Sequence, residues 1–474
     1  MIRQPATVGV TGPTGPSIQI RVIRLDVLPP IRLLARQFQD LPGLAVLDGG
    51  PTGAGNGRWS YLAADPYDSV RWTRDGVRSD GLGVMDSDGF EALHTLTVTE
   101  YQPTEALPPF IGGAIGYIAY EASCEPELLS RGRGDQSLTD LMWAGLYDWV
   151  VARDGRDGTG WIVATDVGGR DPEEACAGVH ERLRSSDVPI VVSRTRQGIS
   201  NVGRSEFGRW VEVVKDYISA GDCYQVNVAR RIEFDPVSSG LDHFERLASI
   251  HPASFGAYIE AGELAIVSAS PELFLEVDPA GRALTRPIKG TAPRGSTKVL
   301  DSDAESRLRA SCKDRAENLM IVDVLRNDFG RVCVPGSIRV PSLWTTEALP
   351  TVWQLVSEVS GCLREGVTAT DLLRACWPGG SITGAPKIRA MQIIDEIEPV
   401  TRDVYCGTIF ALGHDGALMA SLAIRTVQLH HERAYLHVGA GIVADSDPAL
   451  EFQETVAKAR GVLEALGITE NYEL

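Results

Sequence analysis

The sequence predicts a fold that combines β-strands with α-helices. From residue 18 to about 184, short apolar runs alternate with Gly, Asp and Pro, a pattern typical of strands and turns. Beyond residue 204, apolar residues recur at helical spacing, as in Phe207, Val211 and Val214. A chain of 474 residues is too long for a single hydrophobic core, so we expect two or three domains or one large composite fold.

Composition and charge restrict the class of protein. With 43% hydrophobic and 23% charged residues, the chain has the composition of a soluble globular protein. Its net charge of -18 argues against sequence-independent binding of nucleic acid, and an anionic substrate would need local basic residues. Neither a spanning apolar run nor the apolar core of a signal peptide is present. We therefore expect a cytoplasmic protein that binds neither nucleic acid nor a membrane.

The cysteines do not predict a metal site or a thiol nucleophile. Eight are scattered along the chain, without a Cys-x-x-Cys pair or metal-ligand spacing. None lies in a Gly-x-Cys-x-Gly turn of the kind that activates a thiol. We expect free, buried thiols and no glutaminase within this chain.

Breaks in the apolar pattern divide the chain into four parts. Residues 1–18 are rich in Gly, Pro and Thr and are predicted to be a disordered tail. Residues 19–184 form an N-terminal unit of strands, and 185–203 a linker containing Pro and Gly. The candidate functional residues concentrate in residues 204–467, the predicted catalytic domain.

The first elements of that domain are a helix and a strand. Ser205 is placed to cap a helix that ends at Gly221. Residues 223–234 then read as a strand, in which alternation puts Gln225 and Asn227 together on one face. Either that polar face lines a site, or this is an edge strand whose polar face meets water.

A predicted hairpin brings an acid towards an amine. The strand at residues 264–270 stops at Pro271, which leaves Glu272 at its C-terminal end as a candidate general acid. A turn at residues 278–281 returns the chain towards Lys289. The alternative for Glu272 is a solvated turn residue.

Lys289 is the candidate nucleophile. It lies between Arg286 and Arg294, in a segment that contains prolines and glycines. A lysine reacts only when its neutral form is populated, and we expect burial beside these two arginines to lower its pKa. The alternative is an ordinary cationic surface turn.

Acidic residues three apart place two carboxylates on one face of each of two predicted helices. The pairs are Asp314 with Glu317 and Glu451 with Glu454. If the two faces oppose each other, repulsion makes the arrangement costly without a divalent cation, and Mg²⁺ would resolve it. Taken alone, each pair is better explained as a complement to a helix dipole.

Further residues suit an anionic ligand. Lys458 lies one helical turn after Glu454, where it either forms a salt bridge or anchors a substrate carboxylate. Arg425 is a candidate carboxylate clamp, and the glycines of residues 437–441 leave backbone N–H groups approachable. The glycine-rich loop at residues 379–387 suits an anion without naming one.

Taken together, these motifs closely resemble the chorismate-utilising enzymes. The resemblance is strong over residues 205–465 and loose before them. It rests on Tyr224-Gln-Val-Asn227, Ser270-Pro-Glu272, Pro287-Ile-Lys-Gly-Thr291, Glu317-Asn-Leu-Met-Ile-Val-Asp323, Gly379-Gly-Ser-Ile-Thr-Gly-Ala-Pro-Lys387, Ala423-Ile-Arg-Thr426, Gly439-Ala-Gly-Ile442 and Glu451-Phe-Gln-Glu-Thr455.

The resemblance implies a fold and a reaction. The fold is α+β, a large antiparallel two-sheet β-sandwich with helices packed outside and the site between the sheets. In this family Lys289 stands where anthranilate- and isochorismate-forming members usually carry alanine, and Gln225 where water-using members carry a lysine base. The resemblance therefore implies amination of chorismate at C4 by ammonia, with Lys289 bound covalently at C2 and Glu272 as acid. The product would be 4-amino-4-deoxychorismate, in the folate branch.

The same resemblance assigns binding roles. Glu317 and Glu454 would bind Mg²⁺ directly, and Asp314 and Glu451 through water, so that the metal holds the ring carboxylate. Ammonia would come from a separate glutamine amidotransferase subunit. The residues assigned to chorismate are Thr291, Gly439 and Gly441 near the ring carboxylate, and Tyr405, Arg425 and Lys458 at the enolpyruvyl carboxylate.

The sequence departs from the family pattern at two places, and two alternative functions remain. Gln354 stands where many relatives have histidine, so the proton-handling role of that histidine is absent. Residues 45–50 lack the Leu-Leu-Glu-Ser pattern of tryptophan-inhibited anthranilate synthases, which argues against tryptophan feedback. The alternatives are the large subunit of an anthranilate-forming enzyme and a catalytically idle binding subunit.

Overall fold

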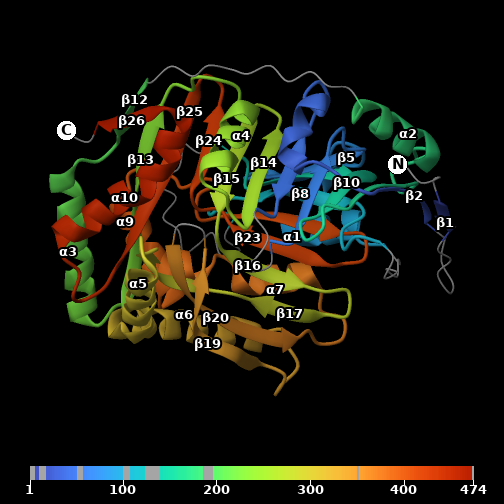
Figure 1. Ribbon diagram of the computed structural model, residues 1–474. Coiled ribbons are helices and arrows are strands. Elements are labelled where there is room, and N and C mark those ends of the chain that lie inside the picture. The colour runs from blue at the N-terminus through green and yellow to red at the C-terminus, as the bar shows by residue number, and fades with distance from the viewer. Residues whose placement is uncertain are drawn as a thin grey trace.

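The computed structural model describes residues 6–9, 18–50, 57–99, 107–122, 139–184, 196–349 and 352–471. In this part of the chain the strands form two large sheets, with helices packed on the outside (Figure 1). Among the described pairings, only β12 with β26 is parallel. The predicted antiparallel-rich two-sheet sandwich with outer helices is therefore confirmed.

The first sheet contains most of the longer strands. Its described strands, in spatial order, are β1 (Ala6–Gly9), β2 (Gln19–Leu25), β11 (Gly160–Thr165), β10 (Trp149–Asp154), β4 (Trp59–Ala63), β3 (Ala45–Asp48), β14 (Phe255–Ala261), β15 (Leu264–Ser270), β24 (Thr426–His430), β25 (Arg433–Ile442), β13 (Gln225–Phe234), β12 (Arg196–Ser200) and β26 (Ile468–Asn471), with β21 (Gly384–Ala385) beside β13.

The second sheet lies against the first. Its described strands, in spatial order, are β18 (Ile288–Pro293), β20 (Val352–Cys362), β17 (Arg282–Thr285), β16 (Leu273–Val277), β23 (Leu418–Leu422), β22 (Thr408–Gly413), β8 (Gly113–Ile118), β9 (Met142–Tyr147), β5 (Asp68–Thr73), β6 (Gly76–Ser79) and β7 (Gly83–Met85), with β19 (Arg339–Ala348) beside β20.

Helices cover the outer faces of both sheets. They are η1 (Ile31–Leu33), η2 (Ala35–Phe38), α1 (Gly89–Thr97), α2 (Pro172–Arg182), α3 (Arg204–Ala220), α4 (Gly240–Ile250), α5 (Lys298–Ala310), α6 (Cys312–Gly330), α7 (Ala369–Cys376), α8 (Gly380–Thr383), α9 (Lys387–Ile397) and α10 (Pro448–Leu466). None of these helices, as far as the described residues go, is long and apolar enough to span a bilayer.

Alternation along the strands explains the layers. In β10, Val150 and Ala152 face the core between the sheets. Their neighbours Trp149 and Val151 face the outer core, which is shared with η1, α2 and α4. Because successive strand residues point to opposite faces, a run that is apolar throughout is buried on both sides.

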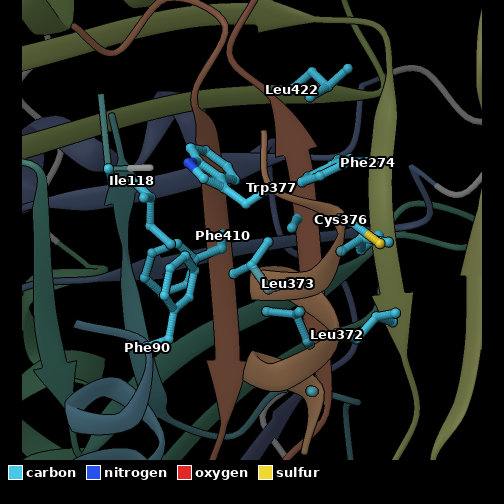
Figure 2. Packing of buried hydrophobic residues seen from close by; sticks show 14 of the residues in the cluster. Phe90, Ile118, Phe274, Leu372, Leu373, Cys376, Trp377, Phe410 and Leu422 are labelled. Carbon is cyan, nitrogen blue, oxygen red and sulfur yellow. The ribbon is translucent and has the colours of Figure 1, made fainter. Parts of the chain in front are cut away.

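The outer core of the second sheet is packed by α1, α6 and α7. Figure 2 shows Leu373 of α7 beside Phe410 of β22, and Leu372, Phe90 and Trp377 belong to the same cluster. Phe274 and Trp377 meet edge to face, with ring centroids 6.1 Å apart. This packing fixes the segment that leads into the glycine-rich loop at residues 379–387.

Early and late parts of the sequence interleave in both sheets. In the first sheet β3 pairs with β14, and in the second β8 pairs with β22. The sheets therefore form the composite architecture that the resemblance implied. The predicted domain boundary at residue 184 does not separate the two sheets, because each sheet contains strands from both sides of it. The boundary itself stays a prediction.

Two predicted boundaries differ from the structure. The tail 1–18 contains β1, whose backbone pairs with β2. Within the linker 185–203, residues 185–195 lie outside the described residues, whereas 196–200 form β12 between β13 and β26. Strand pairing is a long-range interaction, which the local Gly and Pro content does not report.

One helix begins earlier than predicted. Gly203, not Ser205, is the N-cap of α3, and no side-chain cap is formed there. The predicted end is correct, because Gly221 closes the helix with a φ of 85°.

The chain crosses between the sheets at two neighbouring points. Glu272 lies where β15 of the first sheet leads into β16 of the second, and Arg425 lies where β23 leads back into β24. The crossings are tied together, since Ser270 Oγ donates to the carbonyl of Leu422 (2.6 Å) and the Leu422 N–H donates to the carbonyl of Glu272 (3.1 Å). Two charged side chains are thereby fixed at the boundary of the two layers.

Removing the ring of Phe410 tests the outer core. Phe410→Ala should lower the free energy of unfolding by about 3–5 kcal/mol, because the lost ring leaves a cavity under α7. Urea unfolding followed by circular dichroism measures the change. Val84→Ala, on a strand residue that is 83% exposed, is the matched control and should change stability by less than about 0.5 kcal/mol. Equal effects of the two substitutions would contradict this packing.

Candidate active site

Lys289 lies partly buried on β18, at the end of the second sheet. Its Nζ donates to the carbonyl of Ser381 (3.0 Å). Burial lowers the pKa of Lys289, and Lys458 lowers it further, while Glu317, Glu272 and Glu454 oppose the shift. The neutral amine that a nucleophile requires is therefore favoured relative to a solvated lysine.

The predicted cause of this shift was partly wrong. Arg286 is paired with Glu347 and with Glu358 (3.0 Å), and Arg294 is paired with Asp301 (2.6 Å). Their own carboxylates neutralise both guanidinium groups, so burial and Lys458 lower the pKa of Lys289 instead. The arginines hold the two ends of the segment in place.

Glu272 is buried beside the amine, as the predicted hairpin requires. Its Oε1 accepts from Ser381 Oγ (3.0 Å) and from the Ile288 N–H (3.4 Å). Burial raises the pKa of Glu272, although Lys289 and the Ser381 hydrogen bond act against the rise. A raised pKa makes a carboxyl better suited to act as a general acid than a solvated carboxyl.

Ser381 is the residue that sequence reasoning missed. Its carbonyl accepts from Lys289, and its hydroxyl donates to Glu272, so one residue of α8 holds both reactive groups. It lies in the glycine-rich loop already noted as suited to an anion. The loop's composition identified the segment but could not show that Ser381 faces the amine.

Gln225 and Asn227 form the polar lining at β13. Both side chains are buried, at 1% and 7% exposure, which excludes the alternative of an edge strand facing water. Both polar atoms of Gln225 and the Nδ2 of Asn227 have no hydrogen-bond partner among the described residues. Buried polar groups normally have partners, so these point to a ligand.

Gly439 and Gly441 of β25 lie across from that lining. Asn227 is paired with Gly441 in the sheet. A methyl group on Gly441 would overlap Gln225 Nε2, and one on Gly439 would lie 2.9 Å from the hydroxyl of Tyr405. Space beside the polar lining therefore depends on glycine at these two positions.

Carboxylates of the two acidic helices interact electrostatically with each other and with Lys289. Burial raises the pKa of Glu317 on α6, and Glu454 on α10 adds to the rise. Burial likewise raises the pKa of Glu451, with a further contribution from Glu454. Asp314 packs against Gly290, next to Lys289. The charges of Glu317 and Glu454, which come from two different helices, thus lie within electrostatic range of one another.

Lysines balance these acids. Lys458 Nζ lies 2.7 Å from Glu454 and donates to the carbonyl of Gly439 (2.9 Å), and Lys313 lies 3.9 Å from Glu317. The salt bridge expected of Lys458 therefore coexists with a contact to the glycine strand. Across the described chain, the four carboxylates are not among the groups whose ligand atoms gather within 4.8 Å of one another.

Tyr405 and Arg425 complete the predicted set. Tyr405 is buried and stacks on His437, with ring centroids 5.3 Å apart. Arg425 has an exposed side chain, within electrostatic range of Glu272, on a left-handed backbone with a φ of 52°. A non-glycine residue in that conformation is uncommon and often marks a functional position.

Thr291 stands apart from the buried members of the set. It is exposed on β18, opposite the buried Gln354 of β20. The structure thus links Lys289 to Glu272 through Ser381, places Gln225 beside Gly441, and leaves Thr291 at the margin.

Behind the site, Arg402 is a second residue that sequence reasoning missed. Its buried guanidinium donates to both oxygens of Glu398 (2.6 and 2.9 Å) and to the carbonyls of Asn227 (2.6 Å) and Ile382 (3.1 Å). It thereby ties β13 to α8, the elements that carry Gln225 and Ser381.

A family model described as chorismate binding enzyme matches residues 54–464. The chain belongs to this family. Members of the chorismate binding family similar to it include aminodeoxychorismate synthase component 1 of Salmonella typhimurium, 38% identical over 90% of this chain and 93% of that protein. Anthranilate synthase component 1 of Neisseria gonorrhoeae is 34% identical over 86% of this chain and 87% of that protein.

Solved structures agree with the family assignment. The crystal structure of anthranilate synthase component I from Streptococcus pneumoniae matches with a TM-score of 0.78 and 29% identity, covering 86% of this chain and 93% of that chain. The menaquinone-specific isochorismate synthase MenF of Escherichia coli shares the fold, with a TM-score of 0.70 at 19% identity.

Gly441→Ala tests the space beside the polar lining. The added methyl displaces Gln225, so we expect binding of chorismate to weaken by roughly tenfold, the effect of losing about 1.4 kcal/mol. Isothermal titration calorimetry measures the change. Gly178→Ala on α2, where a methyl meets nothing within 4 Å, is the control and should leave binding unchanged. Unaltered affinity in Gly441→Ala would place the ligand elsewhere.

Proposed function

We propose that this protein aminates chorismate at C4 with ammonia, giving 4-amino-4-deoxychorismate and water. The observation that carries the proposal is the group formed by Lys289, Ser381 and Glu272, in which an amine with a lowered pKa lies beside a carboxyl with a raised pKa. The curated relatives named aminodeoxychorismate synthase component 1, at 38–41% identity in the enterobacterial proteins, support the same reaction.

The proposed steps use these residues directly. The neutral Lys289 amine adds to C2 of chorismate, both ring double bonds shift, and the C4 hydroxyl leaves as water with a proton from Glu272. Ammonia then adds at C4, both double bonds shift back, and Lys289 leaves C2 as a neutral amine. The nitrogen now at C4 gives its extra proton to the Glu272 carboxylate, which restores the acid. Because C2 is occupied by Lys289, nitrogen enters at C4 rather than at C2.

The polar lining has a separate role in the proposal. A lysine at position 225 could deprotonate water as the competing nucleophile, whereas the neutral amide of Gln225 cannot. Its unpartnered donor and acceptor instead suit the orientation of ammonia or of the ring substituents.

The acidic helices suit a magnesium ion as cofactor. Carboxylate oxygens are its preferred ligands, and the mutual repulsion of Glu317 and Glu454 is what a divalent cation relieves. In the proposal Glu317 and Glu454 hold the ion directly, with Asp314 and Glu451 acting through water. When bound, Mg²⁺ would neutralise the ring carboxylate of chorismate.

The remaining residues would hold the other end of chorismate. Lys458 and Arg425 supply positive charge near Glu272 and Gly439, and Tyr405 supplies a hydroxyl. We propose that they retain the enolpyruvyl carboxylate, which this reaction does not eliminate. Ammonia would be delivered by a separate glutamine amidotransferase subunit, consistent with the name component 1 in the relatives. The product would serve 4-aminobenzoate and folate synthesis.

Identification of the product tests the proposal. Purified protein with chorismate, Mg²⁺ and an ammonium salt should form an amino product that an added lyase converts to 4-aminobenzoate, and replacing Mg²⁺ by EDTA should abolish turnover.

Lys289→Ala should lower the rate by at least about 100-fold and remove any covalent adduct seen by intact-mass and peptide analysis. Lys289→Arg keeps a positive charge and should be equally inactive. Direct formation of anthranilate would instead indicate the large subunit of an anthranilate-forming enzyme. The absence of turnover with any nitrogen source would indicate a catalytically idle binding subunit.

Ser381→Ala tests the link between acid and amine through pH. The Ser381 hydrogen bond favours the charged form of Glu272, so its removal should raise the pKa of Glu272. The limb of the kcat/KM profile that reports this carboxyl should move to higher pH. Ser381→Thr retains a hydroxyl and should restore the original profile. A profile unchanged in Ser381→Ala would show that this hydrogen bond does not act on the acid.

A further inference from the structure

A second set of metal-ligating side chains lies away from the acidic helices. It consists of Glu263, in the turn between β14 and β15, with His430 and His431, at the turn between β24 and β25. The ligand atoms of the three residues lie within 4.8 Å of one another. We refer to these three residues as the His-Glu cluster.

The backbone at His431 brings two adjacent histidines to the same side. Successive side chains of a strand point to opposite faces, so neighbours in a strand do not normally share a ligand. His431 has a left-handed φ of 54°, which turns its ring back towards His430, and the ring centroids are 4.1 Å apart. An uncommon backbone conformation for a non-glycine residue is what assembles the cluster.

Pairing of the strands holds the third ligand in register. Leu264 is paired with His430 across β15 and β24, which places Glu263 beside the end of β24. His431 Nε2 lies 3.6 Å from Glu263 Oε2, longer than a normal hydrogen bond. The carboxylate of Glu263 and the imidazole of His431 therefore face each other without forming a direct hydrogen bond.

The nearby arginines have other partners. Arg433, two residues beyond His431, pairs with Glu233 (3.3 Å) and Asp235 (3.2 Å). Arg71 approaches the turn at Gly262 but pairs with Asp140 (3.7 Å). Among the described residues, neither of these arginines pairs with Glu263, and its exposed carboxylate faces His431.

We propose that the His-Glu cluster binds a zinc-type divalent ion. Two imidazoles and a carboxylate are a ligand set that Zn²⁺ accepts, with water in the remaining position. Imidazole ligands favour late transition metals over Mg²⁺, so this site and the acidic helices would select different ions. A bound ion would join the β14–β15 turn to the β24–β25 turn at one rim of the first sheet.

The position of the cluster keeps it separate from the chemistry. Arg425 directly precedes β24, and His430 is its last residue. The two residues are five positions apart, or about 17 Å at the rise of an antiparallel strand. Metal binding here requires none of the residues assigned to chorismate, and its test is independent of the proposed reaction.

Zinc binding to tag-free full-length protein tests the proposal. The starting protein carries Cys312→Ser and Cys362→Ser, which remove exposed thiols, and Cys124→Ser, at a position outside the described residues. Competition with a chromophoric zinc chelator in millimolar Mg²⁺ should show one Zn²⁺ bound per chain. Zn²⁺ should also raise the melting temperature, because it binds the native state.

Variants of the cluster decide the outcome. Glu263→Gln and His431→Asn should each weaken Zn²⁺ binding by at least roughly tenfold, since even loss of an outer-shell partner costs 10–100-fold. Asparagine tolerates the left-handed backbone at position 431, so that variant should retain the fold, which circular dichroism checks. His180→Asn on α2 is the control and should bind as the starting protein does. Unchanged affinity in both cluster variants, or displacement of Zn²⁺ by Mg²⁺, would overturn the proposal.

Discussion

The proposed chemistry depends on holding one partly buried lysine amine among carboxylates. A buried charge is costly, so a buried lysine either loses its proton or is paired with a carboxylate. The groups around Lys289 favour both outcomes to some extent. Glu272, Glu317 and Glu454 favour the ammonium form, whereas burial and Lys458 favour the amine, and the net effect is a lowered pKa. The Ser381 carbonyl gives the amine a partner that either protonation state can use.

The two-sheet sandwich supplies the positions that this balance requires. Glu272 and Arg425 lie at the points where the chain passes between the sheets, so neither belongs to a continuous strand whose face would be covered by the opposite layer. The Ser270 and Leu422 hydrogen bonds fix those crossings to each other. Gly439 and Gly441 leave room beside Gln225, and the buried pair of Arg402 with Glu398 joins β13 to the Ser381 segment. Packing and hydrogen bonding far from Lys289 therefore determine what surrounds it.

Much of this arrangement could be predicted from the sequence, for physical reasons that differ between residues. The hairpin that brings Glu272 to Lys289 and the acidic faces of α6 and α10 follow from local spacing, which alternation and helical periodicity report. The two-sheet fold followed from resemblance, because the pairing of β3 with β14 or β8 with β22 is long-range. The sequence suggested that Arg286 and Arg294 lower the pKa of Lys289, but it could not show that Glu347, Glu358 and Asp301 pair with them in the fold. Ser381 and Arg402 were missed because their roles depend on contacts that no local pattern encodes.

The most direct test of the central claim is the titration of the Lys289 amine itself. Its reactivity towards a small acylating reagent can be followed across pH by peptide mass spectrometry, with exposed lysines of the same molecule as internal references. We expect an apparent pKa for Lys289 clearly below the value of about 10.4 of a solvated lysine. A pKa at or above that value would mean that the amine remains a structural cation among the carboxylates, and the nucleophilic role would have to be abandoned.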